Sequence, residues 1–129
     1  IIVNADRRPA NPNCLTSGNE IAIFDHELSF SQAQELFWKE PWHQNGFDRI
    51  SVADNHIFAP MFFEEKPVQL NRFKAAWEAI PVVRFKQYCN ALPVEWAINN
   101  EFLEGIVGYL EQTQTNIGLI IERGLEKLK

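Results

Sequence analysis

The second half of this 129-residue chain carries apolar residues that recur every three or four positions. That spacing puts side chains on one face of an α-helix. The pattern runs through residues 69–80, 82–92 and 99–128. Pro81 suits the first position of a new helix, and Pro93 ends the second stretch because proline cannot continue a helix. The sequence therefore predicts a mainly α-helical protein.

Glycines interrupt the last of these stretches, residues 99–128. They are Gly105, Gly108, Gly118 and Gly124. Each weakens a helix by up to about 1 kcal/mol relative to Ala. We expect these glycines either to permit close packing against another helix or to accompany a bend between Gly108 and Gly118.

A different pattern occupies residues 13–25, near the N-terminus. Two short runs, Cys14–Thr16 and Ile21–Phe24, flank a turn-rich group in which Gly18 supplies a positive φ. This predicts a β-hairpin, and because two strands are marginal alone, its apolar face should pack on something else.

The predicted fold is one domain, residues 1–129, of the mainly α class (α+β with one small β-hairpin near the N-terminus). Residues 1–27 would form a hairpin region with a catalytic loop, and residues 28–129 a helical bundle. Within that bundle we also expect a helix over residues 32–39, which Ser29 or Ser31 could cap, and a short helix over residues 55–63 despite Pro60.

Charge and cysteine content exclude some classes of function. The net charge is −5 and no basic cluster exceeds Arg7-Arg8, so direct nucleic-acid binding is not expected. No apolar run approaches the about 20 residues of a membrane span. Cys14 and Cys89 have no metal-type spacing, and we expect two reduced, buried thiols and a cytoplasmic location.

The residues around the hairpin suggest chemistry. Asp6 and Asn11 have Asp-x₄-Asn spacing on a Pro-containing loop, and Asp25 follows the second strand. Phosphoryl transfer uses one carboxylate to orient a hydroxyl, and an amide plus a carboxylate to hold Mg²⁺ against nucleotide phosphates. The structural alternative is that Asp6 and Asn11 bond to the loop backbone and that Asp25 caps the next segment.

This stretch resembles the HipA-like kinase domain family. Members have the form Asp-Arg-x-x-x-Asn-Pro-Asn, then strand, turn, strand and Asp-His, which residues 6–13 and 14–26 match. His56–Phe58, Pro93–Trp96 and the long terminal helix resemble the family's helical C-terminal part. The resemblance implies the C-terminal lobe of a protein-kinase-like fold.

The resemblance also implies roles for individual residues. Asp6 would be the catalytic base or hydroxyl-orienting carboxylate, and Asn11 and Asp25 would bind the metal and, through it, the nucleotide. Asn13 would add a polar contact. His26 stands where ordinary protein kinases have the Phe of their Asp-Phe-Gly motif.

The implied activity is Mg²⁺- and ATP-dependent phosphoryl transfer to Ser or Thr of a protein substrate, with an antitoxin-like partner as in toxin–antitoxin kinases. The chain has no Gly-rich phosphate loop, and a β-sheet lobe with its phosphate-pairing Lys would precede Ile1. We therefore expect this chain alone to be inactive or weak. The alternative is a non-catalytic helical interaction module with a kinase-like lobe, a reading that its many aromatic residues also fit.

Overall fold

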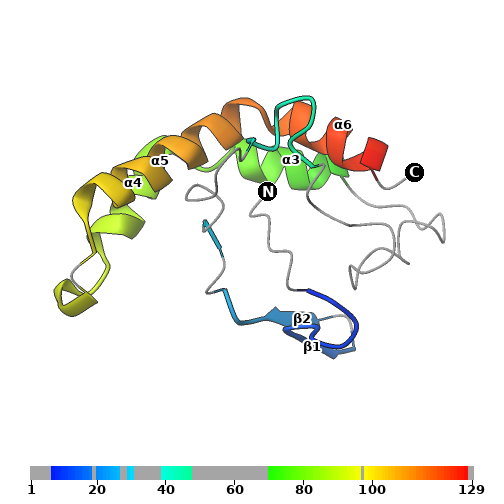
Figure 1. Cartoon of the computed structure of the whole chain (residues 1–129), viewed down its shortest axis with the longest axis horizontal. Coiled ribbons are helices and arrows are strands. Elements are labelled where there is room, and N and C mark those ends of the chain that lie inside the picture. The colour runs from blue at the N-terminus through cyan, green and yellow to red at the C-terminus, as the bar shows by residue number, and fades with distance from the viewer. Residues whose placement is uncertain are drawn as a thin grey trace. The chain divides into compact units, whose positions relative to one another are not determined.

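The computed structural model describes residues 7–18, 20–26, 29–30, 39–47, 70–96 and 98–127. The chain divides into two compact units: Ile1–Val68 with Glu122–Lys129, and Gln69–Ile121. Within the described ranges there are four α-helices, one short 3₁₀ helix and one two-stranded hairpin (Figure 1). A mainly helical fold with one small hairpin near the N-terminus is therefore confirmed.

The hairpin belongs to the first unit. Strand β1 (Cys14–Ser17) pairs antiparallel with β2 (Glu20–Ile23), with Cys14 opposite Ile23 and Ser17 opposite Glu20. Gly18 has a φ of 57°, as expected for the turn. Leu15 is 67% exposed and Ile21 48% exposed. The expectation that the apolar side chains of the hairpin pack against another element is therefore wrong for these two residues.

Two consecutive helices, α3 (Leu70–Glu78) and α4 (Val82–Asn90), begin the second unit. Pro81 lies between them with φ −63° and ψ 133°, so its extended ψ makes it the N-cap of α4. The expected position of Pro81 inside the first turn is thus wrong by one residue. Helix α4 ends before Pro93, as expected, and the 3₁₀ helix η2 (Val94–Trp96) follows.

The long C-terminal pattern forms two helices, α5 (Asn100–Thr115) and α6 (Ile117–Lys127), separated at Asn116. Asn116 has φ −103° and ψ 13°, and its side-chain amide donates to the Gln112 carbonyl over 2.8 Å. This break confirms the expected interruption between Gly108 and Gly118. Close helix packing does not explain Gly105 or Gly108, because no described atom lies within 4 Å of a Cβ built at either position.

The core of the Gln69–Ile121 unit lies where α5 packs against α3 and α4. Phe85 of α4 and Val107 of α5 are buried there, and Ile117 and Ile120 of α6 are also buried. The rings of Trp77 and Phe85 lie with centroids 6.5 Å apart and join α3 to α4. The predicted apolar stripes are thus buried only in part, because Phe73 of α3, Val82 of α4 and Phe102 of α5 are 44%, 46% and 38% exposed.

Several expectations fall on other residues. The helix expected over residues 32–39 lies outside the described residues except for Lys39, which is not helical, and the helix expected over 55–63 lies wholly outside them. The expected boundary between the hairpin region 1–27 and the bundle 28–129 falls at Glu27 and Leu28, which are also outside them.

Candidate functional site

A tight loop precedes the hairpin. The Arg8 amide donates to the Asn11 carbonyl over 3.1 Å, and the Asn11 amide donates to the Arg8 carbonyl over 2.9 Å. Pro9 and Ala10 form the tip between these two bonds. Asn11 therefore sits at the base of a closed loop, with its backbone fixed by reciprocal hydrogen bonds and its side chain half-buried.

The two ends of the hairpin carry unusual backbone angles. Asn13 has φ 47° and Asp25 has φ 56°, and the Phe24 amide donates to the Asn13 carbonyl over 3.1 Å. Among residues other than glycine, Asn and Asp tolerate this left-handed region best. The chain consequently turns sharply immediately before β1 and again after β2, and the second turn places an exposed Asp25 at the end of the hairpin.

The Arg7 side chain joins these two ends. It is buried, with 7% of its surface exposed. One guanidinium nitrogen, Nη1, donates to the Asn13 carbonyl, and Nη2 donates to the Phe24 carbonyl over 3.3 Å. Nη2 also lies 3.4 Å from Nδ1 of His26. A single cation therefore links the backbone before β1 to the backbone after β2.

Sequence reasoning missed the role of Arg7. It treated this residue as part of a small basic pair, although Arg directly follows Asp in the motif Asp-Arg-x-x-x-Asn. That position was the available signal. His26, which follows Asp25 in the motif, contacts Arg7 through Nδ1.

The predicted site residues are only partly within the described structure. Asp6 lies outside the described residues, while Asn11 and Asp25 are both described and both belong to the first unit. Asn11 and Asp25 also take part in other polar or ring contacts. The cluster around Arg7 lies within two positions of each of them along the chain, because Asn13 follows Asn11 across Pro12 and Phe24 directly precedes Asp25.

The available donors fit Mg²⁺ in type. The Asn11 amide and the Asp25 carboxylate offer hard oxygen ligands, and Mg²⁺ is commonly held by one or two carboxylates together with phosphate oxygens and waters. Among the described residues, no group of three or more His, Cys, Asp and Glu side chains is placed to hold a metal. Within the described part of the chain, Asn11 and Asp25 are therefore the candidate ligands.

The other two histidines are His43 and His56. His43 Nε2 lies 3.1 Å from Glu40 Oε2, and both side chains are substantially exposed. His56 is not among the described residues. The pairing of His43 with Glu40 is a surface contact of small energetic value.

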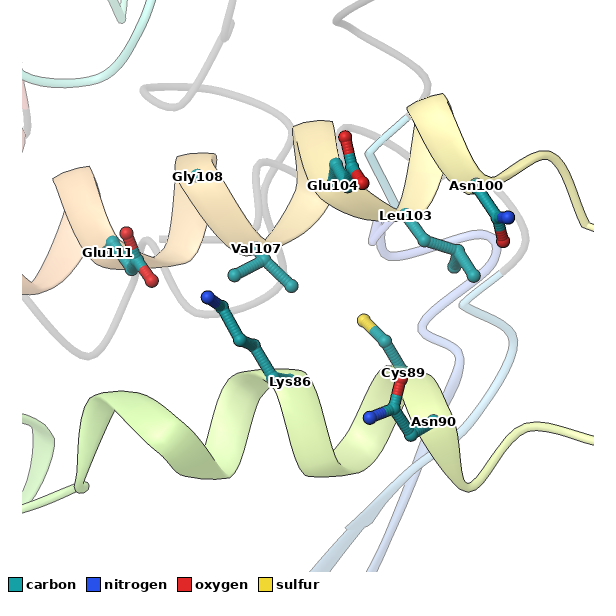
Figure 2. Close-up of a pocket in the computed structure, with 9 residues that line it drawn as sticks. All are labelled: Lys86, Cys89, Asn90, Asn100, Leu103, Glu104, Val107, Gly108 and Glu111. Atoms are coloured by element: carbon teal, nitrogen blue, oxygen red, sulfur yellow. The ribbon is translucent and has the colours of Figure 1, made fainter.

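A hollow of about 570 Å³ lies in the helical unit, between α4 and α5. Figure 2 shows Lys86 and Cys89 extending from α4 toward α5, and Leu103 and Val107 extending from α5 toward α4. The lining includes charges of both signs and two amides. These residues are Lys86, Cys89, Asn90, Asn100, Leu103, Glu104, Val107, Gly108 and Glu111.

Both cysteines are free, as expected, but each is only half-buried. The expectation of buried thiols is therefore wrong in degree. Cys89 opens onto the α4–α5 hollow, and Cys14 begins strand β1.

No helix in the described part of the chain has both the length and the apolar character needed to cross a membrane. Comparison with known proteins gives no match: no protein-family model, curated protein or solved structure matches this chain.

Proposed function

We propose that this chain forms the C-terminal lobe of a HipA-like Ser/Thr protein kinase, in which it supplies the hydroxyl-orienting and metal-binding side of the active site. The observation that supports this most is the arrangement around Arg7. One buried guanidinium bonds the carbonyls of Asn13 and Phe24, next to the motif positions Asn11 and Asp25. A cytoplasmic location and an antitoxin-like partner belong to the same proposal.

Each motif residue has a role in this proposal. Asp6 orients the substrate hydroxyl and accepts its proton, as the catalytic-loop Asp does in protein kinases. Asn11 and Asp25 hold Mg²⁺, with Asp25 exposed at the end of the hairpin. When bound, Mg²⁺ supplies positive charge against the phosphate oxygens of ATP.

A metal-dependent nucleotide titration tests the proposal. ATP is titrated into the chain by calorimetry with and without Mg²⁺, and wild type is compared with Asp25→Ala. We expect Asp25→Ala to weaken Mg²⁺-dependent ATP binding by about tenfold or more, equivalent to about 1.4 kcal/mol, because a charged ligand to the metal is lost. Glu20→Ala is the matched control, since it removes an exposed carboxylate from the same hairpin. Equal affinities for wild type and Asp25→Ala would contradict the proposal.

One observation favours the alternative of a helical interaction module. Large apolar side chains of α4 and η2 are strongly exposed: Tyr88 of α4 is 62% exposed, and Val94 and Trp96 of η2 are 86% and 63% exposed. Exposed apolar groups that gather on a surface commonly mark protein contacts. A module of this kind predicts no effect of Asp25→Ala in the same titration, so one experiment separates the two functions.

A further inference from the structure

The guanidinium of Arg7 makes contacts that a simple point charge could not make. Arginine offers five N–H donors in a rigid planar fork, whereas lysine offers one compact ammonium group. In this chain the fork reaches three acceptors on two segments: the carbonyls of Asn13 and Phe24, and Nδ1 of His26. The planar shape therefore matters as well as the charge.

Burial makes these contacts obligatory. Arg7 is 7% exposed, and a buried charge is costly unless hydrogen bonds satisfy it. Asn13 and Phe24 are already joined by a backbone hydrogen bond, in which the Phe24 amide donates to the Asn13 carbonyl. Arg7 therefore adds to a link that already connects the two ends of the hairpin. If the fork is lost, the start and the end of the hairpin lose their shared partner.

Arg7 bonds to the backbone at, or next to, two residues with an unfavourable left-handed conformation. Asn13 and Asp25 both have positive φ, at 47° and 56°. Such residues cost free energy and persist only where their surroundings determine them. Asp25 follows Phe24 directly, so the carbonyl contact of Arg7 fixes the peptide that leads into the left-handed turn.

We propose that Arg7 is a positioning residue, which sets the geometry of Asn11 and Asp25 for metal binding through the backbone on either side of the hairpin. This inference rests on the proposed function, because it requires that Asn11 and Asp25 hold Mg²⁺. Arg7 itself touches neither metal nor substrate. Its role resembles that of residues that orient metal ligands without touching the metal. Mutation of such residues typically weakens metal affinity about 10–100-fold.

The test uses Arg7→Lys, which keeps the positive charge and removes the fork. Arg8→Lys is the matched control, since Arg8 is the adjacent and exposed arginine. Two properties are measured on the whole chain: Mg²⁺-dependent ATP affinity by calorimetry, and the Mg²⁺-induced shift of the Asp25 backbone amide resonance. Thermal unfolding of each variant is followed in parallel.

We expect Arg7→Lys to lower Mg²⁺-dependent affinity by about tenfold or more and to reduce the Asp25 amide shift. The control Arg8→Lys should leave both unchanged. If Arg7→Lys does not fold, His26→Ala serves as the second variant, because it removes one of the three acceptors and leaves both carbonyl contacts. It should weaken affinity by a smaller factor.

The outcomes separate the two proposals. If wild type binds Mg²⁺-ATP in an Asp25-dependent way and neither Arg7→Lys nor His26→Ala weakens it, the positioning role is wrong and the proposed function stands. If Arg7→Lys changes thermal unfolding alone, Arg7 is only structural. If wild type shows no Asp25-dependent binding, the proposed function fails and the positioning role fails with it.

Discussion

At the scale of single residues, the side chain of Gln114 bonds to backbone carbonyls at the C-terminal end of a different helix, α3. Its side-chain amide, on α5, donates to the carbonyls of Ile80 and Trp77 over 2.7 and 3.0 Å, and lies 3.4 Å from the Glu78 carbonyl. The last carbonyls of a helix have no partner within it. Gln114 therefore supplies donors to carbonyls at and just beyond the C-terminal end of α3, where the Trp77 carbonyl also accepts from the Ile80 amide.

We predict that Gln114→Ala destabilises the chain by about 1–3 kcal/mol, because it removes the hydrogen-bond donor of partly buried carbonyls. Urea unfolding measures this change. Gln112→Ala is the matched control, since Gln112 is exposed on the same helix. Equal unfolding free energies for the two variants would show that the contact contributes nothing.

At the scale of elements, local signals predicted the structure well where local chemistry decides it. Gly18 marks the hairpin turn, Pro93 follows the end of α4, and the glycine-containing stretch breaks at Asn116. The contacts of Arg7 and Gln114 could not be predicted in the same way. Each joins segments that lie far apart in the sequence, and no periodicity indicates which polar side chain turns inward.

The same limit applies to the candidate site. The spacing of Asp6, Asn11 and Asp25 is visible in the sequence, but the buried guanidinium that bonds to the Asn13 and Phe24 carbonyls is not. Thr113 of α5 is a second side chain whose burial the sequence does not indicate. It is polar and fully buried, whereas the sequence pattern marks only apolar residues as facing inward. Side-chain burial depends on the neighbouring elements, which a one-dimensional pattern does not contain.

Helix α5 contains a glycine, Gly105, whose replacement by alanine should stabilise the helix. Gly105 lies on an exposed part of α5, and a Cβ added there meets no described atom within 4 Å. We predict that Gly105→Ala stabilises the chain by up to about 1 kcal/mol, because Ala restricts the unfolded backbone and adds no clash. Thermal unfolding measures the gain.

Gly18→Ala provides the opposing control for this prediction. Gly18 also has open space around it, but its φ of 57° disfavours a side chain. Gly18→Ala should therefore destabilise the chain by about 1 kcal/mol or more. A loss of stability in Gly105→Ala would mean that the open position on α5 is needed for a contact.

At the scale of the whole molecule, the two units carry different properties. Arg7, Asn11 and Asp25 belong to the unit Ile1–Val68 with Glu122–Lys129, whereas the buried helical core and the α4–α5 hollow belong to Gln69–Ile121. The proposed chemistry thus draws on the loop and hairpin of one unit. The helical unit offers the exposed apolar residues on which the alternative function depends.

The charge and the motif content of the whole chain lead to the last prediction. Kinases hold the ATP phosphates with a Gly-rich loop and a paired Lys, and the 129 residues contain no such loop. The net charge of −5 also disfavours a nucleotide polyanion, so the proposed binding of ATP would depend on Mg²⁺. We therefore expect this chain with Mg²⁺ and radiolabelled ATP to transfer no phosphate above background to a Ser- and Thr-containing protein. Asp6→Ala, which lacks the proposed hydroxyl-orienting carboxylate, should give the same background. A transfer rate that Asp6→Ala abolishes would mean that the chain alone holds ATP productively, and that residues other than a Gly-rich loop cradle its phosphates.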